Sequence, residues 1–229
     1  MIKLSKRLQK IASLVDLNSK VIDVGTDHGY VPNFLCEKNI SRDVIATDIS
    51  MNSLEKSIEL TKKLNNDDKI RNILCDGIYN EYRDNIIIAG LGGIQIAEII
   101  EKSIEISKVA NKLILQPMQK NHILRRELYN MDFDIIDEEI VYEDNRYFEI
   151  IIAKYTGEKI NYENSDIYIS KAQIKKKNRV FLDSLIERKK NLKNIIENFN
   201  SSSNEALKRK EELIELYKKM EEAINEISN

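Results

Sequence analysis

Short runs rich in isoleucine and valine alternate with helix-length stretches in the part of the chain that precedes Gly157. These runs occupy residues 20–24, 43–48, 70–74, 85–89 and 112–116. Strand, helix and strand repeated in this way predict an α/β fold, with a mostly parallel sheet covered by helices on both faces. Two more β-rich stretches, 134–142 and 146–155, are joined by a short turn and predict an antiparallel hairpin at the sheet edge.

After Gly157 the strand pattern stops, and apolar residues recur with helical spacing among Lys and Glu. One heptad seam, broken by Lys189, consists of Leu182, Leu185, Leu192, Ile196 and Phe199. A second, broken by Lys210, consists of Ala206, Leu213, Tyr217, Met220, Ile224 and Ile227. Such seams pair with each other, and the polar segment 200–204 between them predicts a turn. We therefore predict an α/β domain over 1–157 and a C-terminal α-helical coiled-coil hairpin over 158–229. Pairing between chains satisfies the same pattern, and we expect a monomer or a weak dimer.

Positive charge is concentrated in two segments, although the chain of 229 residues has a formal net charge of −2. Residues 1–20 hold five basic side chains and one acidic one, and residues 171–193 hold nine basic and two acidic ones. Clusters of this kind are typical of nucleic-acid contacts, but solvated helix faces show the same pattern.

Cysteine content and hydropathy exclude several classes of protein. Cys36 and Cys75 are the only cysteines, without a CxxC motif, so neither a disulfide framework nor a metal site is expected, and both thiols should be buried. The longest apolar runs have the length of a strand, which disfavours a transmembrane helix. The first residues lack the apolar core of a signal peptide, and we expect a cytoplasmic protein without a membrane partner.

A glycine-containing loop follows the first expected strand and precedes an expected helix. It reads Asp23-Val24-Gly25-Thr26-Asp27-His28-Gly29. A dinucleotide-binding loop has a glycine where this chain has Asp27, so a carboxylate lies where a pyrophosphate would place negative charge. The loop therefore disfavours NAD and favours a ligand with a cationic centre.

Three further strands end in residues suited to bind a nucleoside. Asp48 ends the second strand, where an acid accepts hydrogen bonds from ribose hydroxyls. Asp76 and Gly77 follow the third strand and suit an adenine amino group, and the glycine-rich segment 90–93 leaves open backbone after the fourth. The carboxyl ends of parallel strands meet at one edge of a sheet, which predicts a single site.

Five segments, taken in order, are similar to one family. They are Leu4-Ser5-Lys6-Arg7-Leu8, Asp23 to Pro32, Ile88-Ala89-Gly90-Leu91-Gly92-Gly93, Leu113-Ile114-Leu115-Gln116-Pro117, and Glu143-Asp144 with Tyr147-Phe148-Glu149. The chain resembles the TrmK family of bacterial tRNA (adenine-22 N1)-methyltransferases. The resemblance implies a class I, Rossmann-like methyltransferase domain joined to a coiled coil, S-adenosylmethionine as cofactor, and methylation of an adenine in the D-arm of tRNA.

The loop pattern and the resemblance together predict the residues of the site. Expected cofactor-binding residues are Asp23, Gly25, Thr26, Asp27, Gly29, Asp48, Ile49, Asp76, Gly77, Gly90, Leu91 and Gly92. Expected substrate-binding residues are Tyr30, Pro32, Gly93, Gln116, Pro117, Lys6, Arg7, Arg125, Arg126, Lys175, Lys176 and Lys177. Adenine N1 carries a free lone pair at neutral pH, so alignment matters more than a base. Asp27 and His28 are the candidate catalytic residues, because a carboxylate stabilises the charge that develops on the base.

Other interpretations remain at this point. Asp27 is also suited to cap the following helix, and His28 to hold the loop in place. A methyltransferase acting on a small molecule or a protein would use the same pocket without the cationic segments. An NAD-linked oxidoreductase and a non-enzymatic RNA-binding or coiled-coil protein are the alternatives from other classes.

Overall fold

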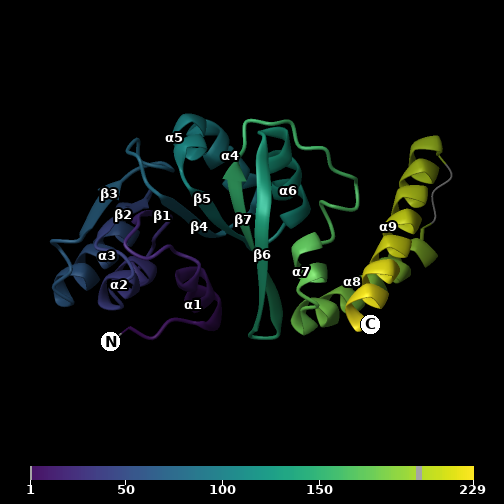
Figure 1. Ribbon diagram of the computed structural model, residues 1–229, viewed down its shortest axis with the longest axis horizontal. Coiled ribbons are helices and arrows are strands. Elements are labelled where there is room, and N and C mark those ends of the chain that lie inside the picture. Colours follow the sequence, from purple (N-terminus) through teal and green to yellow (C-terminus); the bar gives the residue numbers. More distant parts are fainter. Residues whose placement is uncertain (1, 200–202) are drawn as a thin grey trace. The chain divides into compact units, whose positions relative to one another are not determined.

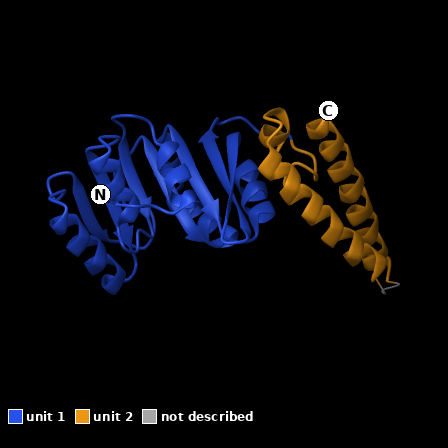
Figure 2. Cartoon of the chain, turned by 90° about the horizontal axis from the view of Figure 1, so that it is seen from below, with its two compact units in different colours: residues 1–161 blue, residues 162–229 orange. Residues whose placement is uncertain are grey.

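The computed structural model describes residues 2–199 and 203–229. The chain divides into two compact units, unit 1 over residues 1–161 and unit 2 over residues 162–229 (Figure 2). The boundary thus follows Asn161, whereas the sequence pattern places it after Gly157. Met1 of the first basic segment and residues 200–202 of the predicted turn lie outside the described residues.

Unit 1 is built on a seven-stranded sheet in the order β3-β2-β1-β4-β5-β7-β6 (Figure 1). Its strands are β1 (Lys20–Val24), β2 (Asp43–Asp48), β3 (Ile70–Leu74), β4 (Asn85–Leu91), β5 (Lys112–Pro117), β6 (Phe133–Glu143) and β7 (Arg146–Tyr155). Strands β1 to β5 pair in parallel, and β7 pairs antiparallel with both β5 and β6. The predicted mostly parallel sheet with an antiparallel hairpin at its edge is therefore confirmed.

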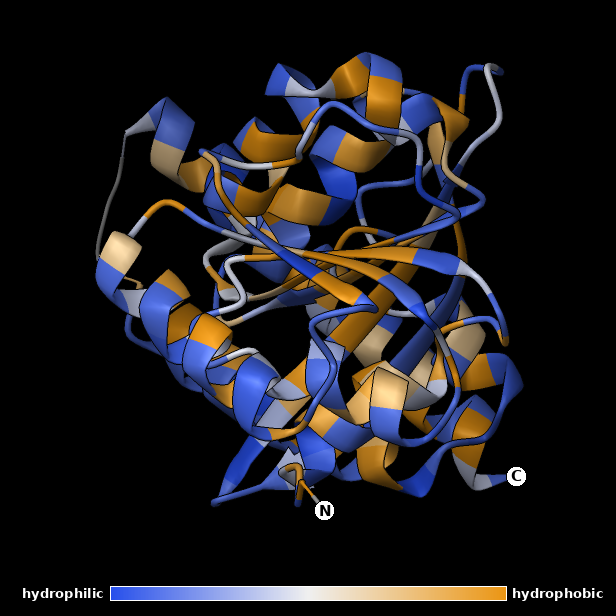
Figure 3. Ribbon diagram, turned by 90° about the vertical axis from the view of Figure 1, so that its left-hand side faces the viewer, coloured by the Kyte–Doolittle hydropathy of each residue, from blue (hydrophilic) through white to orange (hydrophobic). Residues whose placement is uncertain are grey.

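Adjacent residues of a strand point to opposite faces of the sheet. Because both sets are apolar in the central strands, both faces are covered by helices. Ile86 and Ile88 of β4 belong to one core cluster and Ile87 to the other, and all three are fully buried. The hydropathy colours show the apolar strands inside the unit (Figure 3). The helices of unit 1 are α1 (Lys6–Ser13), α2 (Tyr30–Glu37), α3 (Met51–Lys63), α4 (Gly93–Lys102), α5 (Ile104–Val109) and α6 (Asn121–Asn130).

Unit 2 contains α7 (Lys171–Lys175), α8 (Arg179–Glu197) and α9 (Asn204–Ser228), and α8 packs against α9 within one chain. The buried apolar residues of α8 include the predicted Leu182, Leu185 and Leu192. The predicted α9 seam is only partly right, because the buried residues are Leu216, Met220, Ala223 and Ile227. Apolar side chains form more than one stripe along α9, and each stripe has the 3-4 spacing of a heptad seam. Packing buries the stripe that contains Leu216 and Ala223.

No helix in the described part of the chain is both long enough and apolar enough to cross a membrane. The two cysteines differ in exposure. Cys36 is buried, and burial raises the pKa of its thiol to about 11. The prediction that Cys75 is buried is wrong, because this residue follows β3 at the rim of a cavity and is partly exposed.

Candidate active site

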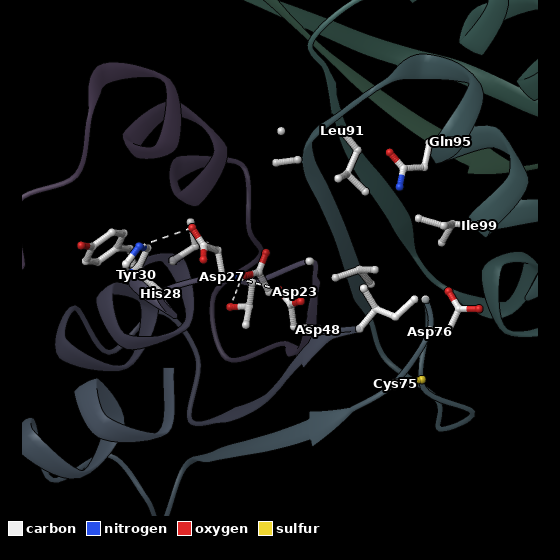
Figure 4. A pocket seen from close by; sticks show the side chains of 18 of the residues that line it. Asp23, Asp27, His28, Tyr30, Asp48, Cys75, Asp76, Leu91, Gln95 and Ile99 are labelled. Carbon is white, nitrogen blue, oxygen red and sulfur yellow. Dashed lines mark hydrogen bonds and ion pairs between the residues drawn. The ribbon is translucent and has the colours of Figure 1, made fainter. Parts of the chain in front are cut away.

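The carboxyl ends of β1, β2, β3 and β4 surround a cavity of about 630 Å³ (Figure 4). This volume is typical of pockets that hold a small molecule or cofactor. Five acidic side chains line the cavity, namely Asp23, Asp27, Asp48, Asp76 and Glu98. One arginine and one lysine also line it, Arg7 and Lys102, together with His28. The lining therefore favours a ligand that carries positive charge.

The glycine loop after β1 is held by hydrogen bonds to its own strand and to β2. Gly25 and Asp27 both have positive φ, +70° and +48°, which turns the backbone sharply. The Thr26 hydroxyl donates to Asp23 over 2.7 Å, and the Asp27 backbone N–H donates to Asp48 over 3.0 Å. The loop is thus built around two carboxylates at neighbouring strand ends.

Asp23 is the most deeply buried carboxylate of the cavity. Burial raises its pKa to about 7, and the nearby charge of Asp48 adds to this, while the hydrogen bond from Thr26 opposes it. Asp48 accepts a second hydrogen bond, from the Ser50 backbone N–H at 2.9 Å, which fixes its orientation. A cationic ligand would favour the ionised form of Asp23.

Asp27 lies at the mouth of the cavity, with its side chain 57% exposed. His28 Nε2 is 3.5 Å from the Asp27 carboxylate, and Lys56 Nζ is 3.9 Å away. The His28 ring stacks on the Tyr30 ring, with centroids 5.2 Å apart. Helix α2 is capped by Gly29 without a side-chain hydrogen bond in the described structure, so Asp27 does not cap it.

Most of the predicted cofactor residues line the cavity: Asp23, Gly25, Thr26, Asp27, Asp48, Ile49, Asp76, Gly77, Gly90 and Leu91. Gly90 has φ of +82°, and apart from Gly90 and its chain neighbours no described atom lies within 4 Å of the position that a Cβ would take. The backbone of β4 is therefore open to a ligand here.

The other three predicted glycines, Gly29, Gly92 and Gly93, do not line the cavity. A Cβ on Gly29 would meet Ser57 Oγ at 2.3 Å, and one on Gly93 would meet the Lys120 carbonyl oxygen at 2.5 Å. Both positions thus permit close packing of helices and loops. Gly92 is the N-cap of α4.

The predicted substrate residues are dispersed. Arg7 and Tyr30 line the cavity, and the exposed Lys6 precedes Arg7 on α1. Pro32, Gln116 and Pro117 are buried outside the lining. Lys175, Lys176 and Lys177 are exposed and belong to unit 2.

The expectation that Arg125 contacts substrate is wrong. Its side chain is 2% exposed and donates hydrogen bonds to Glu138 over 2.5 Å and to Glu149 over 2.6 Å. These two carboxylates raise the pKa of Arg125 against the opposing effect of burial. The guanidinium therefore holds α6 against the hairpin of β6 and β7, whereas its neighbour Arg126 is exposed enough to reach a ligand.

Sequence reasoning missed the contribution of α4 to the cavity. Gln95, Glu98, Ile99 and Lys102 all line it, and Lys102 forms an ion pair with Asp76 at the end of β3. Their spacing places them on one helical face, directly after the glycine-rich segment. That periodicity was the signal available in the sequence.

The fold and the cavity define a class of protein, the Rossmann-like methyltransferases. Residues 4–151 match the family described as a methyltransferase domain. The chain is also 30% identical over 230 residues to the tRNA (adenine(22)-N(1))-methyltransferase of Bacillus subtilis, with 96% of this chain and 95% of the relative covered.

Solved structures agree with this match along the whole chain. The B. subtilis M1A22 tRNA methyltransferase TrmK superposes with a TM-score of 0.87 at 26% identity, covering 98% of this chain and all of that one. M. capricolum TrmK in complex with S-adenosyl-homocysteine gives a TM-score of 0.82 at 25% identity, covering 98% and 99%. The chain belongs to the TrmK family of tRNA (adenine(22)-N(1))-methyltransferases.

Proposed function

We propose that this protein transfers a methyl group from S-adenosylmethionine to N1 of the adenine at position 22, in the D-arm of bacterial tRNA. The observation that carries the proposal is the acidic cavity at the tips of β1 to β4, in a chain related over almost its full length to enzymes of this activity. We further propose that it acts in the cytoplasm, as a monomer or a weak dimer.

The residues of the cavity fit this cofactor. When bound, S-adenosylmethionine supplies a methyl group on a cationic sulfur. We assign to Asp48 and Asp76, which line the cavity, hydrogen bonds from its ribose and adenine, and to Asp23 the balance of its positive charge. The open backbone at Gly90 leaves room near the reacting atoms.

Asp27 and His28 are the proposed catalytic residues. Neutral adenine has a lone pair on N1, so this nitrogen reacts without losing a proton, and catalysis is mainly alignment. The methylated base carries a positive charge, which the exposed Asp27 carboxylate stabilises as it develops. We expect Asp27→Asn to lower kcat about 10- to 100-fold.

Contacts to tRNA phosphates are assigned to the two cationic segments, around α1 and over residues 171–193. Lys and Arg contacts of this kind supply much of the affinity and weaken steeply with salt. The exposed Lys175, Lys176 and Lys177 at the end of α7 are the first candidates in unit 2.

The decisive assay incubates the full chain with labelled S-adenosylmethionine and unmodified bacterial tRNA, and then maps the methylated nucleoside. The proposal expects 1-methyladenosine at position 22 and no product on a transcript with guanine there. Methylation of another nucleoside would contradict the proposed position. Binding of the cofactor without methylation of any tRNA would point to another substrate.

Two charge-reversal variants, one in unit 2 and one control in unit 1, test the assigned tRNA surface. Replacing Lys175, Lys176 and Lys177 by Glu should weaken tRNA binding by on the order of tenfold or more at moderate salt. The matched control reverses Lys62 and Lys63, which are exposed near the end of α3, outside the two segments. Equal effects per reversed charge, with three lysines in the first set and two in the control, would contradict the assignment, as would unchanged affinity after removal of unit 2.

A further inference from the structure

Three arginines in the described part of unit 1 are wholly or partly buried, and two of them form ion pairs with carboxylates. Arg83 contacts Asp43 and Glu81, and Arg125 contacts two glutamates. Arg7 is half-buried, and no carboxylate lies within ion-pair distance of its guanidinium among residues 2–199 and 203–229. Its charge is thus incompletely balanced within the described protein.

Neutral groups hold the Arg7 side chain in one place. Its Nη1 donates a hydrogen bond to Gln116 Oε1, and its guanidinium carbon lies 5.4 Å from the centre of the Phe148 ring. Gln116 is fully buried, and its own amide donates to the Pro117 carbonyl oxygen over 2.8 Å. The acceptor that faces Arg7 is therefore fixed by the end of β5.

Glu143 holds the start of the helix that carries Arg7. Its carboxylate, at the turn between β6 and β7, accepts hydrogen bonds from the backbone N–H of Lys6 at 2.5 Å and of Arg7 at 3.5 Å. A carboxylate is favoured at the N-terminus of a helix, where backbone N–H groups lack partners. The position of α1, and with it the origin of the Arg7 side chain, thus depends on Glu143.

Arg7 lines the cavity on the side next to β5, because its guanidinium donates a hydrogen bond to Gln116. The order β3-β2-β1-β4-β5 places Asp76 and Asp48 at one end of the row and Gln116 at the other. Lys102, the one lysine of the described lining, forms an ion pair with Asp76 at the first end. Arg7 therefore supplies positive charge on the β5 side of the cavity.

Burial lowers the pKa of Arg7, and the charge of Glu143 offsets this only in part. A guanidinium in this setting gains from an anion that brings its own charge into the cavity. The planar fork of arginine suits a carboxylate or a phosphate, which both present two oxygens.

We propose that Arg7 binds an oxyanion of the reacting complex, either the cofactor carboxylate or a phosphate beside the target nucleotide, and that Glu143 is a positioning residue acting through Arg7. The proposal deepens the proposed function and rests on it for the identity of the ligands. Arg7 contacts the ligand directly, whereas Glu143 does not.

The test uses the full chain and two binding probes without tRNA. Affinities for S-adenosylhomocysteine and for 5′-methylthioadenosine, which lacks the amino-acid part, are measured by calorimetry for wild type and Arg7→Gln. If the anion is the cofactor carboxylate, Arg7→Gln weakens S-adenosylhomocysteine about tenfold or more and leaves the second probe unchanged. If it is a phosphate, both affinities stay unchanged, kcat/KM for tRNA falls about tenfold or more, and the salt dependence of tRNA binding becomes shallower. Unchanged values in both arms would overturn the proposal.

The positioning role is tested with Glu143→Ala, Glu143→Gln and the matched control Asp144→Asn. Asp144 is exposed in the same turn and already has a positive φ, which Asn tolerates. Arg7→Gln lowers either the affinity for S-adenosylhomocysteine or kcat/KM for tRNA. Glu143→Ala should lower that same quantity by several-fold and Glu143→Gln by less, whereas Asp144→Asn should leave it unchanged.

The double variant separates positioning from a general loss of stability. In the Arg7→Gln background, Glu143→Ala should have no further effect on the affected quantity, although melting temperatures fall further. If the two effects multiply, the positioning role is wrong. If wild type binds S-adenosylhomocysteine but methylates no tRNA, the proposed function fails, while the calorimetric arm still decides whether Arg7 binds the carboxylate.

Discussion

Gly29 offers the sharpest test of how packing shapes the cavity loop. It has φ of +67°, and a Cβ there would lie 2.3 Å from Ser57 Oγ, 3.0 Å from Ser57 Cβ and 3.2 Å from Ser57 Cα. The last two atoms belong to α3 and cannot rotate away. Gly29→Ala therefore combines a strained backbone with an overlap between α2 and α3.

The expected size follows from these two effects. An alanine in the left-handed region costs about 1–2 kcal/mol, and forced overlap in a packed region costs about 1–3 kcal/mol more. The free energy of unfolding should thus fall by about 2–5 kcal/mol. At this chain length each kcal/mol shifts Tm by roughly 2–4 °C, so the loss is on the order of 10 °C.

Gly90→Ala is the matched control, because Gly90 has φ of +82° and, its chain neighbours aside, no described atom lies within 4 Å of the position of a Cβ. The free energy of unfolding of this variant should fall only by the backbone cost, about 1–2 kcal/mol. The added methyl group should also weaken cofactor binding, because Gly90 lines the cavity. Thermal unfolding by circular dichroism measures both variants. If Gly29→Ala melts no lower than Gly90→Ala, the packing explanation for Gly29 is refuted.

Three further predictions concern charge and register. Arg125→Met removes the cation that faces two buried carboxylates and should cost about 3–5 kcal/mol in urea unfolding, whereas Arg126→Met at the exposed neighbour should cost little. Burial raises the folded-state pKa of Asp23 from 3.8 to about 7, so wild-type stability declines as pH rises through that window. Asp23→Asn should remove this decline, and parallel pH profiles for the two proteins would contradict it. Leu216→Ala should destabilise the buried seam of α9 by about 2–4 kcal/mol and Leu213→Ala by less, and equal losses would argue for the other seam.

Features that depend on neighbouring residues could be predicted from the sequence. The five parallel strands follow from apolar runs of strand length separated by helices, and the hairpin of β6 and β7 from its short turn. The glycine loop after β1 and the acids that end β2 and β3 also lie where the pattern predicts them. Parallel strands bring their carboxyl ends to one edge, so a local pattern was sufficient to predict a shared site.

Contacts between distant segments could not be predicted in this way. Arg125 is cationic and follows His122 on an expected surface helix, yet the structure buries it between two glutamates of the hairpin. Sequence composition identifies a charge but not the helix face on which it lies relative to the sheet. That orientation is decided by the burial of the whole apolar stripe of α6.

The sequence by itself thus determined the alternation of elements, the glycine loop and the acids at the strand ends, since these depend on periodicity and turn chemistry within a few residues. Only the tertiary structure decided which stripe of α9 faces α8, and that Arg7 meets Gln116 and Glu143 from elsewhere in the chain. The reason is physical: a side chain finds its partners through the packing of entire elements, and that packing minimises exposed apolar surface over the whole unit.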